Sequence, residues 1–340
     1  MKNVIVLSSL VLLLLTGCSQ PSNTATSSPD TSKKPIIYKI SAGVPDSHFE
    51  VAALKELEKH VESKTNGEID IQIFPNNQLG DDKEALELIQ QGVVQMVPTG
   101  TSALSNFEKS FSILSSPYLF KSQDDINNLL GGEWGKDLLA TMDNSGFIGL
   151  GFGTLGFTNM SNNIRPIVTA DDIKDLKIRC VQNPLLLDFY KEVGAKPVSM
   201  SFNELFAALQ QGVVDGQFNP FTTIVSSNLN EVQKYVSKTK DIASLVVFTV
   251  NKAAFNDLTS DQQQAINEGV DLAIDYMSES LDKEEAEAEK QLIESGTITI
   301  NEVSDETKTE LFNRGYSVIE KYGNEVNAEL FNKLKKELGL

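Results

Sequence analysis

The sequence of 340 residues is poor in the side chains that bind transition metals and form disulfides. It has two cysteines, Cys18 and Cys180, and two histidines, His48 and His60, and no second His or Cys stands at ligand spacing from either histidine. This scarcity argues against a zinc-type metal centre. The sequence also lacks a G-x-S-x-G elbow, an H-E-x-x-H motif and a P-loop, which argues against the common hydrolase and phosphate-binding chemistries.

Positive charge is also scarce, because 29 Lys and Arg residues stand against 47 Asp and Glu residues, for a formal net charge of −18 at pH 7. Binding to nucleic acid and broad docking on anionic lipid both need a basic surface, so this balance argues against both. The composition, 40% hydrophobic and 22% charged, is that of a globular protein. The length favours two lobes.

One hydrophobic segment precedes the rest of the chain. It comprises Val4–Leu7 and Leu10–Leu15, too short to span a bilayer but suited to the core of a signal peptide. It ends in Leu15-Thr16-Gly17-Cys18, which resembles the lipobox of bacterial lipoproteins. The resemblance implies that residues 1–17 are a signal peptide cut before a diacylated Cys18, and that the mature protein is lipid-anchored outside the cytoplasm. A plain secretory signal with an incidental cysteine is the alternative.

Residues 18–35 are rich in Ser, Thr, Pro and Asn and are predicted to form a flexible tether. Outside the anchor only Cys180 would remain, so no intramolecular disulfide is expected. Cys180 stands in an apolar run, which predicts a small core residue rather than a nucleophile.

Hydrophobic periodicity after the tether predicts alternating strands and helices. Strands are expected at 36–40 and 69–73, helices at 49–64 and 82–91, and a further strand from Val93 onward. This alternation is typical of α/β layers with parallel strands. A longer helical pattern, from Asp261 to Ser295, predicts a helix that crosses both lobes, and its acidic run at 284–289 is interpreted as a solvated face.

An internal repeat supports the two-lobe organisation. Leu88-Ile89-Gln90-Gln91-Gly92-Val93-Val94-Gln95 recurs, at an offset of 120, as Ala208-Leu209-Gln210-Gln211-Gly212-Val213-Val214-Asp215. We interpret the two copies as equivalent helix–glycine–strand joints in related lobes, although chance similarity at a common joint is the alternative. Ligands of open α/β sheets bind beyond the carboxyl ends of the strands, so two facing lobes predict a cleft between them.

A glycine-rich segment, Gly151-Phe152-Gly153-Thr154-Leu155-Gly156, matches the dinucleotide-binding fingerprint and follows an apolar strand at 147–150. The fingerprint requires a helix that opens with the last glycine, and residues 157–163 have the composition of a loop. We therefore expect the glycines to let the chain cross tightly between the lobes, and we expect no cofactor. An enzyme with a nucleotide cofactor is kept as an alternative, which absorbance of a bound nucleotide would reveal.

Arg179 stands near the end of a predicted strand, Asp175-Leu176-Lys177-Ile178-Arg179-Cys180-Val181, and alternation places it on the face opposite Ile178 and Cys180. An arginine at a carboxyl strand end of an acidic protein is a candidate for bidentate binding of a carboxylate. From the residues alone, an exposed surface arginine is the alternative.

The chain from about Ile36 onward resembles the substrate-binding proteins of TRAP (tripartite ATP-independent periplasmic) transporters, the family of the dicarboxylate and sialic acid binders (DctP-like). An ordered set of motifs carries the resemblance: Phe74-Pro75-Asn76-Asn77-Gln78-Leu79-Gly80-Asp81; Pro117-Tyr118-Leu119-Phe120; Leu176-Lys177-Ile178-Arg179; Gly194-Ala195-Lys196-Pro197-Val198-Ser199-Met200-Ser201-Phe202; Glu204; Ala207-Ala208-Leu209-Gln210-Gln211-Gly212; and Val214-Asp215-Gly216-Gln217-Phe218-Asn219-Pro220.

The resemblance implies roles for individual residues. Arg179 corresponds to the arginine that pairs with the substrate carboxylate, Asn219 to an asparagine beside the ligand, and Phe202 to an aromatic of the pocket wall. Asp82 corresponds, less directly, to an acidic position after Gln-Leu-Gly. The chain departs from the family at Leu155, where many members have a second arginine.

Two further departures concern the polarity of the pocket. Phe218 replaces a family glutamate and lines the pocket with Leu155, and Gly100 stands where an acid is frequent. These departures predict a less polar pocket, so that a 2-oxo monocarboxylate is as reasonable a ligand as a four-carbon dicarboxylate or a sugar acid.

The resemblance also implies an α/β two-lobe fold like that of periplasmic binding proteins, with a central cleft, crossing strands and a long C-terminal hinge helix. Lobe I is expected to comprise 36–152 plus about 246–284, and lobe II 153–245 plus about 285–340. The implied function is not enzymatic: the protein would capture an organic acid and deliver it to the small and large integral membrane subunits of a TRAP transporter. A ligand-sensing lipoprotein that signals to a sensor kinase is the alternative.

Overall fold

The structure is a computed structural model that describes residues 34–340. The predicted signal peptide, the anchor Cys18 and nearly all of the predicted tether lie outside these residues. In the described part, no helix combines the length and the apolar composition that a membrane crossing requires.

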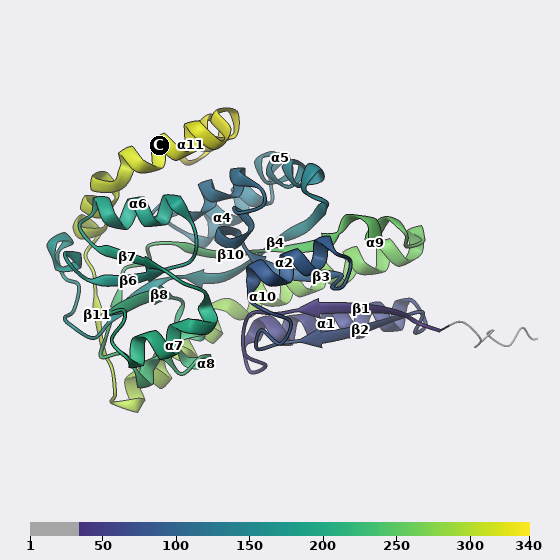
Figure 1. Cartoon of the computed structure of the whole chain (residues 1–340), viewed down its shortest axis with the longest axis horizontal. Helices are drawn as coiled ribbons and strands as arrows, with labels where there is room; N and C mark the ends of the chain where they lie inside the picture. The colour runs from purple at the N-terminus through teal and green to yellow at the C-terminus, as the bar shows by residue number, and fades with distance from the viewer. Residues whose placement is uncertain (1–33) are drawn as a thin grey trace, which may run out of the picture. The chain divides into compact units, whose positions relative to one another are not determined.

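Two mixed sheets form the centre of the fold (Figure 1). The first has the order β2-β1-β3-β10-β4, in which β1 is parallel to β2 and β3, while β10 is antiparallel to β3 and β4. Its strands are β1 (Ile36–Ser41), β2 (Ile69–Phe74), β3 (Met96–Gly100), β4 (Phe147–Phe157) and β10 (Ala243–Asn251).

The second sheet has the order β11-β9-β5-β8-β6-β7. Here β6 is parallel to both β7 and β8, whereas β5 is antiparallel to β8 and β9. Its strands are β5 (Asn159–Asn162), β6 (Lys177–Cys180), β7 (Lys196–Ser199), β8 (Gly216–Asn219), β9 (Tyr235–Lys238) and β11 (Thr299–Glu302). The predicted α/β two-lobe fold is confirmed.

Helices cover both sheets, and two of them are long: α10 has 36 residues and α11 has 34. The α-helices are α1 (Phe49–Lys64), α2 (Asp82–Gln90), α3 (Thr101–Leu104), α4 (Gln123–Leu130), α5 (Glu133–Ala140), α6 (Pro184–Glu192), α7 (Phe202–Gln210), α8 (Phe221–Ser226), α9 (Lys252–Asn256), α10 (Ser260–Ser295) and α11 (Asp305–Leu338). Short 3-10 helices lie at η1 (Lys109–Ser115), η2 (Thr141–Ser145), η3 (Ala170–Ile173) and η4 (Leu229–Glu231).

The chain passes between the two sheets three times; two of the crossings are adjacent, and the third runs from β10 to β11 through α9 and α10. Thr158 connects β4 to β5, and residues 239–242 connect β9 to β10. The crossing segments are hydrogen-bonded to each other, since Thr158 N donates to Ile242 O at 2.8 Å and Asp241 N donates to Thr158 O at 3.2 Å. Helix α10 contacts α1 and β4 of the first lobe and α8 of the second, so it runs along both lobes as predicted.

The internal repeat corresponds to equivalent structure in the two lobes. Helices α2 and α7 have nine residues each, and each begins with a capping box, Asp81 with Glu84 and Ser201 with Glu204. Both helices are followed by a glycine with positive φ, at 73° and 71°. The strand predicted from Val93 begins only at Met96, because residues 91–95 form the turn that follows the helix.

The glycines at 151–156 lie inside strand β4, and strand β5 follows rather than a phosphate-binding helix. They let α10 approach the sheet: a Cβ at Gly151 would lie 2.6 Å from Ile274 Cδ1, and one at Gly153 would lie 2.9 Å from Met277 Cε. The acidic run on α10 is less uniformly solvated than predicted. Glu285 accepts hydrogen bonds from the backbone N–H groups of Phe221 and Thr222 and so caps α8.

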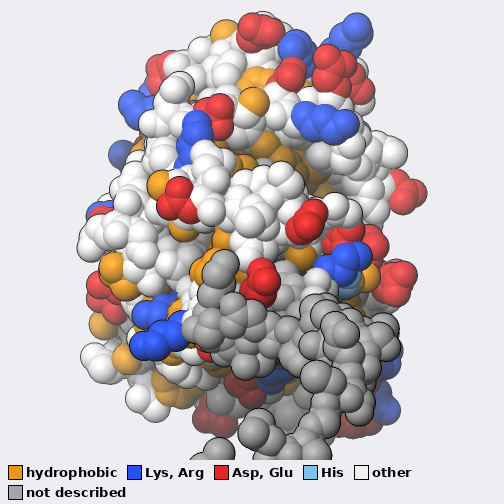
Figure 2. All heavy atoms as spheres, turned by 90° about the vertical axis from the view of Figure 1, so that its right-hand side faces the viewer, with side chains coloured by type: hydrophobic (Ala, Val, Ile, Leu, Met, Phe, Trp, Pro, Cys, Tyr) orange, Lys and Arg blue, Asp and Glu red, His pale blue; other side chains and the backbone are white. Residues whose placement is uncertain are grey.

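Cys180 is fully buried, as predicted. Near the surface, charges of both signs are mixed, and Figure 2 shows Lys and Arg side chains interspersed with Asp and Glu over the uncovered part of one face.

Candidate functional site

A cavity of about 410 Å³ lies between the two sheets. Its walls come from the carboxyl ends of two sets of parallel strands, which is where open α/β sheets present their ligand-binding side chains. From the first lobe, the segments after β1, β2 and β3 contribute Glu50, Asn77, Asp82 and Thr101. From the second lobe, the ends of β6, β7 and β8 contribute Arg179, Phe202 and Asn219.

Arg179 is the charged group of the second-lobe wall. It lies in β6, is only 6% exposed, and its Nε donates to Met200 O at 3.2 Å. Its guanidinium carbon lies 5.7 Å from the centre of the Phe202 ring, within the range of a cation–π contact. Among residues 34–340 no carboxylate forms an ion pair with it. The two terminal nitrogens therefore remain to bind a group in the cavity.

Burial lowers the pKa of Arg179 to about 10, so the side chain is still a cation at neutral pH. A buried cation without a paired anion is unfavourable, and a carboxylate bound in the bidentate geometry offsets that cost. The alternative of an exposed surface arginine is thereby wrong.

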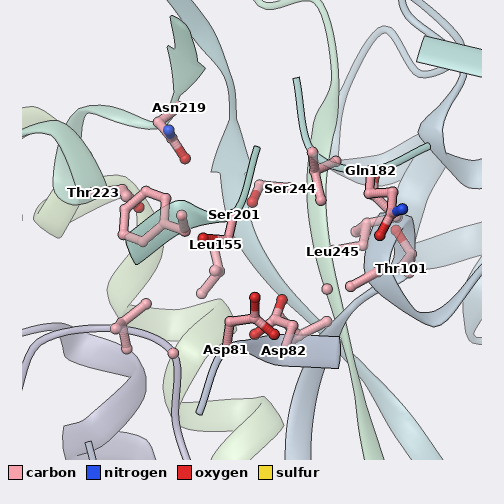
Figure 3. Close-up of a pocket in the computed structure, with 18 of the residues that line it drawn as sticks. Asp81, Asp82, Thr101, Leu155, Gln182, Ser201, Asn219, Thr223, Ser244 and Leu245 are labelled. Carbon is pink, nitrogen blue, oxygen red and sulfur yellow. The ribbon is translucent and has the colours of Figure 1, made fainter. Parts of the chain in front are cut away.

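Asn219 ends β8 and lies across the cavity from Asp81, the N-cap of α2, and Asp82, the first residue of α2 (Figure 3). The amide nitrogen of Asn219 donates to Gln217 Oε1, and Gln217 in turn donates to Ser161 Oγ at 2.8 Å. This chain of bonds orients the Asn219 amide and leaves its second N–H for a ligand.

The first-lobe wall carries two carboxyl groups, of which Glu50 is buried and Asp82 is partly exposed to the cavity. Glu50, in the first turn of α1, is 2% exposed, and burial together with the nearby Asp82 raises its pKa to about 8. Burial and the negative charge of Asp81 raise the pKa of Asp82 to about 6, although Arg179 and a hydrogen bond from the Gly100 backbone act in the opposite direction. Both groups therefore hold a proton more firmly than exposed carboxyls do.

Leu155 and Phe218 form the apolar part of the wall and are 6% and 7% exposed. Phe218 stacks on Tyr190 with ring centres 5.1 Å apart and 21° between the planes. Leu155, in β4, packs in the same core cluster as Leu281 and Met277 of α10. The apolar wall thus continues directly into the packing near the crossing segments.

All six residues predicted to contact the ligand line this one cavity: Arg179, Asn219, Phe202, Asp82, Phe218 and Leu155. The seventh predicted site residue, Cys18, lies outside the described part of the chain. Within residues 34–340, no group of three or more His, Cys, Asp or Glu side chains is arranged to hold a metal ion.

The prediction missed several polar residues of the cavity. Besides Glu50, the wall includes Asn77, Thr101, Asn106, Gln182, Ser201, Thr223 and Ser244. A signal for Glu50 was present in the sequence, because it stands four and seven residues before Leu54 and Leu57 on the apolar face of α1. A glutamate on such a face, at the carboxyl end of a strand, is a candidate ligand-binding residue.

Comparison with known proteins identifies the family. Residues 40–325 match the family described as "Bacterial extracellular solute-binding protein, family 7". A solute-binding protein of Verminephrobacter eiseniae is 32% identical over 265 residues, which cover 78% of this chain and 79% of the relative. The C4-dicarboxylate-binding periplasmic protein DctP of Rhodobacter capsulatus is 32% identical over 277 residues, which cover 81% and 83%.

Solved structures agree. A TRAP periplasmic solute-binding protein of Polaromonas, bound to D-erythronate, aligns with a TM-score of 0.82 and 32% identity over 87% of this chain and 98% of that one. The sugar-acid-binding protein of Advenella mimigardefordensis, in complex with galactonate, aligns with a TM-score of 0.87 and 26% identity over 90% and 98%.

The fold and the cavity between its lobes are those of a two-lobe solute-binding protein. The chain belongs to family 7 of the bacterial extracellular solute-binding proteins, the family of the TRAP transporter receptors, and its role is binding rather than catalysis.

Proposed function

We propose that this protein captures an organic acid in the cavity between its lobes and delivers it to the membrane subunits of a TRAP transporter. The observation that carries this proposal is the buried guanidinium of Arg179, which faces the cavity without a carboxylate partner among the described residues. The relatives that bind C4-dicarboxylates, D-erythronate and galactonate support it, since each of these ligands is a carboxylate.

In this proposal Arg179 binds the ligand carboxylate through two parallel N–H donors, and Asn219 donates a further hydrogen bond. Phe202 lies against Arg179 and bounds the site, while Phe218 and Leu155 contact the apolar part of the ligand. Closure of the lobes would exclude water and strengthen the attraction between Arg179 and the carboxylate.

Calorimetry on Arg179→Ala tests the assignment. Removal of one partner of a desolvated ion pair costs on the order of 2–5 kcal/mol, so affinity for the carboxylate should fall by about thirtyfold or more. Arg179→Lys should restore only part of the loss, since an ammonium group lacks the paired donors of the fork.

Arg314→Ala is the matched control. Arg314 lies on α11 and pairs with Asp171 at 2.9 Å, away from the cavity. Arg165 is unsuitable because its Nε donates to the carbonyl of Asp172 at 2.8 Å and so holds a loop. If Arg179→Ala binds the ligand as tightly as wild type while Arg314→Ala is also unchanged, the carboxylate site lies elsewhere.

We also propose that the lobes, 36–152 plus about 246–284 and 153–245 plus about 285–340, move as rigid bodies about the crossing segments. The repeated α2 and α7 units and the long α10 support two bodies joined along one helix. Small-angle scattering with and without saturating ligand should show a smaller radius of gyration for the bound form, and an unchanged radius would argue against closure.

The lipid anchor is a further part of the proposal. A diacylated Cys18 has two acyl chains, which exceeds the marginal membrane affinity of a single chain. Palmitate labelling and membrane fractionation of wild type and Cys18→Ser test this point. A Cys18→Ser protein that still incorporates label and stays with the membrane would contradict it.

A further inference from the structure

The wall of the cavity that faces Arg179 carries an unusual pair of groups, the carboxyls of Glu50 and Asp82. They come from the first turns of α1 and α2, and the negative charge of Asp82 acts on Glu50. Arg179 acts on Asp82 from across the site but forms no ion pair with it among the described residues. The cation and the two carboxyl groups therefore remain available to a ligand lying between them.

The two carboxyl groups have few hydrogen-bond donors of their own. The Glu50 side chain receives none that the structure records in residues 34–340, and the only backbone donor to Asp82 is Gly100. A buried carboxyl group without donors is costly, so it is satisfied in one of two ways: by water in the empty cavity, or by donor groups of the bound ligand.

Two glycines leave space for the carboxyl group of Asp82. A Cβ at Gly43 would lie 3.0 Å from Asp82 Oδ1, and a Cβ at Gly100 would lie 3.4 Å from Asp82 Oδ2. The space left by the missing side chain at 100 thus lies beside the Asp82 carboxyl. Because the two glycines leave room for it, Asp82 of α2 supplies an acidic group at this place in the wall.

We propose that the ligand is a hydroxylated monocarboxylate, whose carboxylate binds Arg179 and whose hydroxyl groups donate to Glu50 and Asp82. This inference rests on the proposed function and narrows its substrate class. Hydroxyl groups supply the donors that both carboxyls lack, and they bring no further charge into the cavity. A 2-oxo monocarboxylate, which the sequence left as reasonable as a dicarboxylate, has a carbonyl acceptor at this place and offers Asp82 no donor.

A dicarboxylate is the poorer ligand for an electrostatic reason. Its first carboxylate would neutralise Arg179, and its second would then lie against Asp82, whose pKa of about 6 leaves it mostly ionised at neutral pH. Such a contact between like charges weakens the binding of a dicarboxylate, as repulsive elements do in specific binding sites. The C4-dicarboxylate specificity in the name of the Rhodobacter capsulatus relative therefore should not hold for this chain.

Calorimetry at neutral pH on the full receptor tests the inference with D-erythronate and galactonate as hydroxylated monocarboxylates, succinate as dicarboxylate and butyrate as unsubstituted acid. We expect at least one hydroxylated acid to bind about thirtyfold or more tightly than succinate or butyrate. Asp82→Asn should reduce the preference over succinate about tenfold or more, because a charge is removed and an amide N–H donor is gained. Glu50→Gln should change the preference less, because Glu50, with its pKa raised to about 8, is mostly uncharged at neutral pH.

Glu56→Gln on α1 and Glu87→Gln on α2 are matched controls, since both residues are exposed on the same helices and should leave the preference unchanged. Succinate binding as tightly as the hydroxylated acids, or a preference that Asp82→Asn does not change, would overturn the inference. In that case tight succinate binding lost in Arg179→Ala would leave the proposed function intact. If no acid of the panel binds, both the inference and the proposed function fail.

Discussion

The hydroxyl of Tyr190 donates to Asp241 Oδ2 at 2.5 Å and joins the cavity wall to the crossing between the lobes. Asp241 stands in one crossing segment and also accepts a hydrogen bond from Thr158 Oγ1, in the other, at 2.6 Å. The ring of Tyr190 is also stacked on Phe218 of the cavity wall. Burial raises the pKa of Asp241, which is 2% exposed, so its donors are needed to hold the group in place.

Tyr190→Phe removes one of the side-chain donors to Asp241, which also include Thr158 and Thr239, and keeps the ring that stacks on Phe218. We expect a loss of about 1–3 kcal/mol in the free energy of unfolding, because a buried carboxyl is left with an unsatisfied oxygen. Urea denaturation measures this loss.

Tyr322→Phe is the control for this substitution, since it removes a similar bond, to Asp188 Oδ2 at 2.7 Å, on a partly buried side chain of α11. It should cost less than Tyr190→Phe. A loss for Tyr190→Phe no larger than that for Tyr322→Phe would show that Asp241 does not depend on its buried donor.

Gly216 controls the spacing of the strands that carry the ligand-facing residues. It pairs with Ile178, next to Arg179, and begins the strand that ends in Asn219. A Cβ at Gly216 would lie 2.2 Å from the carbonyl oxygen of Ser161, so backbone must move in Gly216→Ala. We expect a loss of about 1–3 kcal/mol in stability, from overpacking, and weaker ligand binding. Thermal unfolding and calorimetry measure the two effects.

Gly151→Ala is the control for Gly216→Ala. It shows how much of the loss comes from replacing any strand glycine with alanine and how much comes from the close backbone contact at Gly216. A Cβ at Gly151 would meet the end of the Ile274 side chain, which can change rotamer. Its losses in stability and affinity should therefore be smaller than those of Gly216→Ala. Equal losses would mean that the strand spacing at Gly216 has no special importance.

Much of the fold could be predicted because its signals are local. The apolar positions of α1, from Val51 to Val61, recur at helical spacing, and the helix spans 49–64 as predicted. The long helix predicted at 261–295 begins one residue earlier, at Ser260. Helix α11 was not predicted, and its course depends on distant contacts: it bends at Asn327, whose amide donates to Ser110 Oγ at 3.3 Å.

The candidate site, like the fold, could be predicted only where the signals are local. Arg179, Phe202 and Asn219 lie at or near the ends of strands, in motifs that can be recognised in the sequence. The resemblance to a known family indicated their roles. Glu50 was missed because a single glutamate in an amphipathic helix is normally assigned to its solvated face. The Asp241 network joins residues 83 and 51 positions apart, and no pattern within one segment indicates such contacts.

The raised pKa of Glu50 predicts a pH-dependent stability. A carboxyl with an ordinary pKa of 4.5 in the unfolded chain and about 8 in the folded protein binds its proton more tightly when folded. Its contribution to stability is fully present below about pH 4.5 and is lost as pH rises through about 8. Asp82, with a pKa raised to about 6, acts in the same direction over a lower range.

His48 acts in the opposite direction, because burial lowers its pKa to about 4, so wild-type stability between pH 4 and 6.5 combines opposing effects. The difference between Glu50→Gln and wild type cancels the His48 contribution. That difference should favour Glu50→Gln increasingly from pH 5 to pH 8, with a slope of at most about 1.4 kcal/mol per pH unit. Urea denaturation at several pH values in this range, without ligand, measures the slope.

Glu56→Gln, on the exposed side of the same helix, should differ from wild type by an amount that does not change with pH over this range. A pH-independent difference for Glu50→Gln as well would mean that Glu50 titrates as an exposed carboxyl does. The expected outcome is instead that the carboxyl which recognises the ligand lowers the stability of the empty receptor at neutral pH. Removing it should give a protein that is more stable at neutral pH without ligand, the usual trade between stability and function at a binding site.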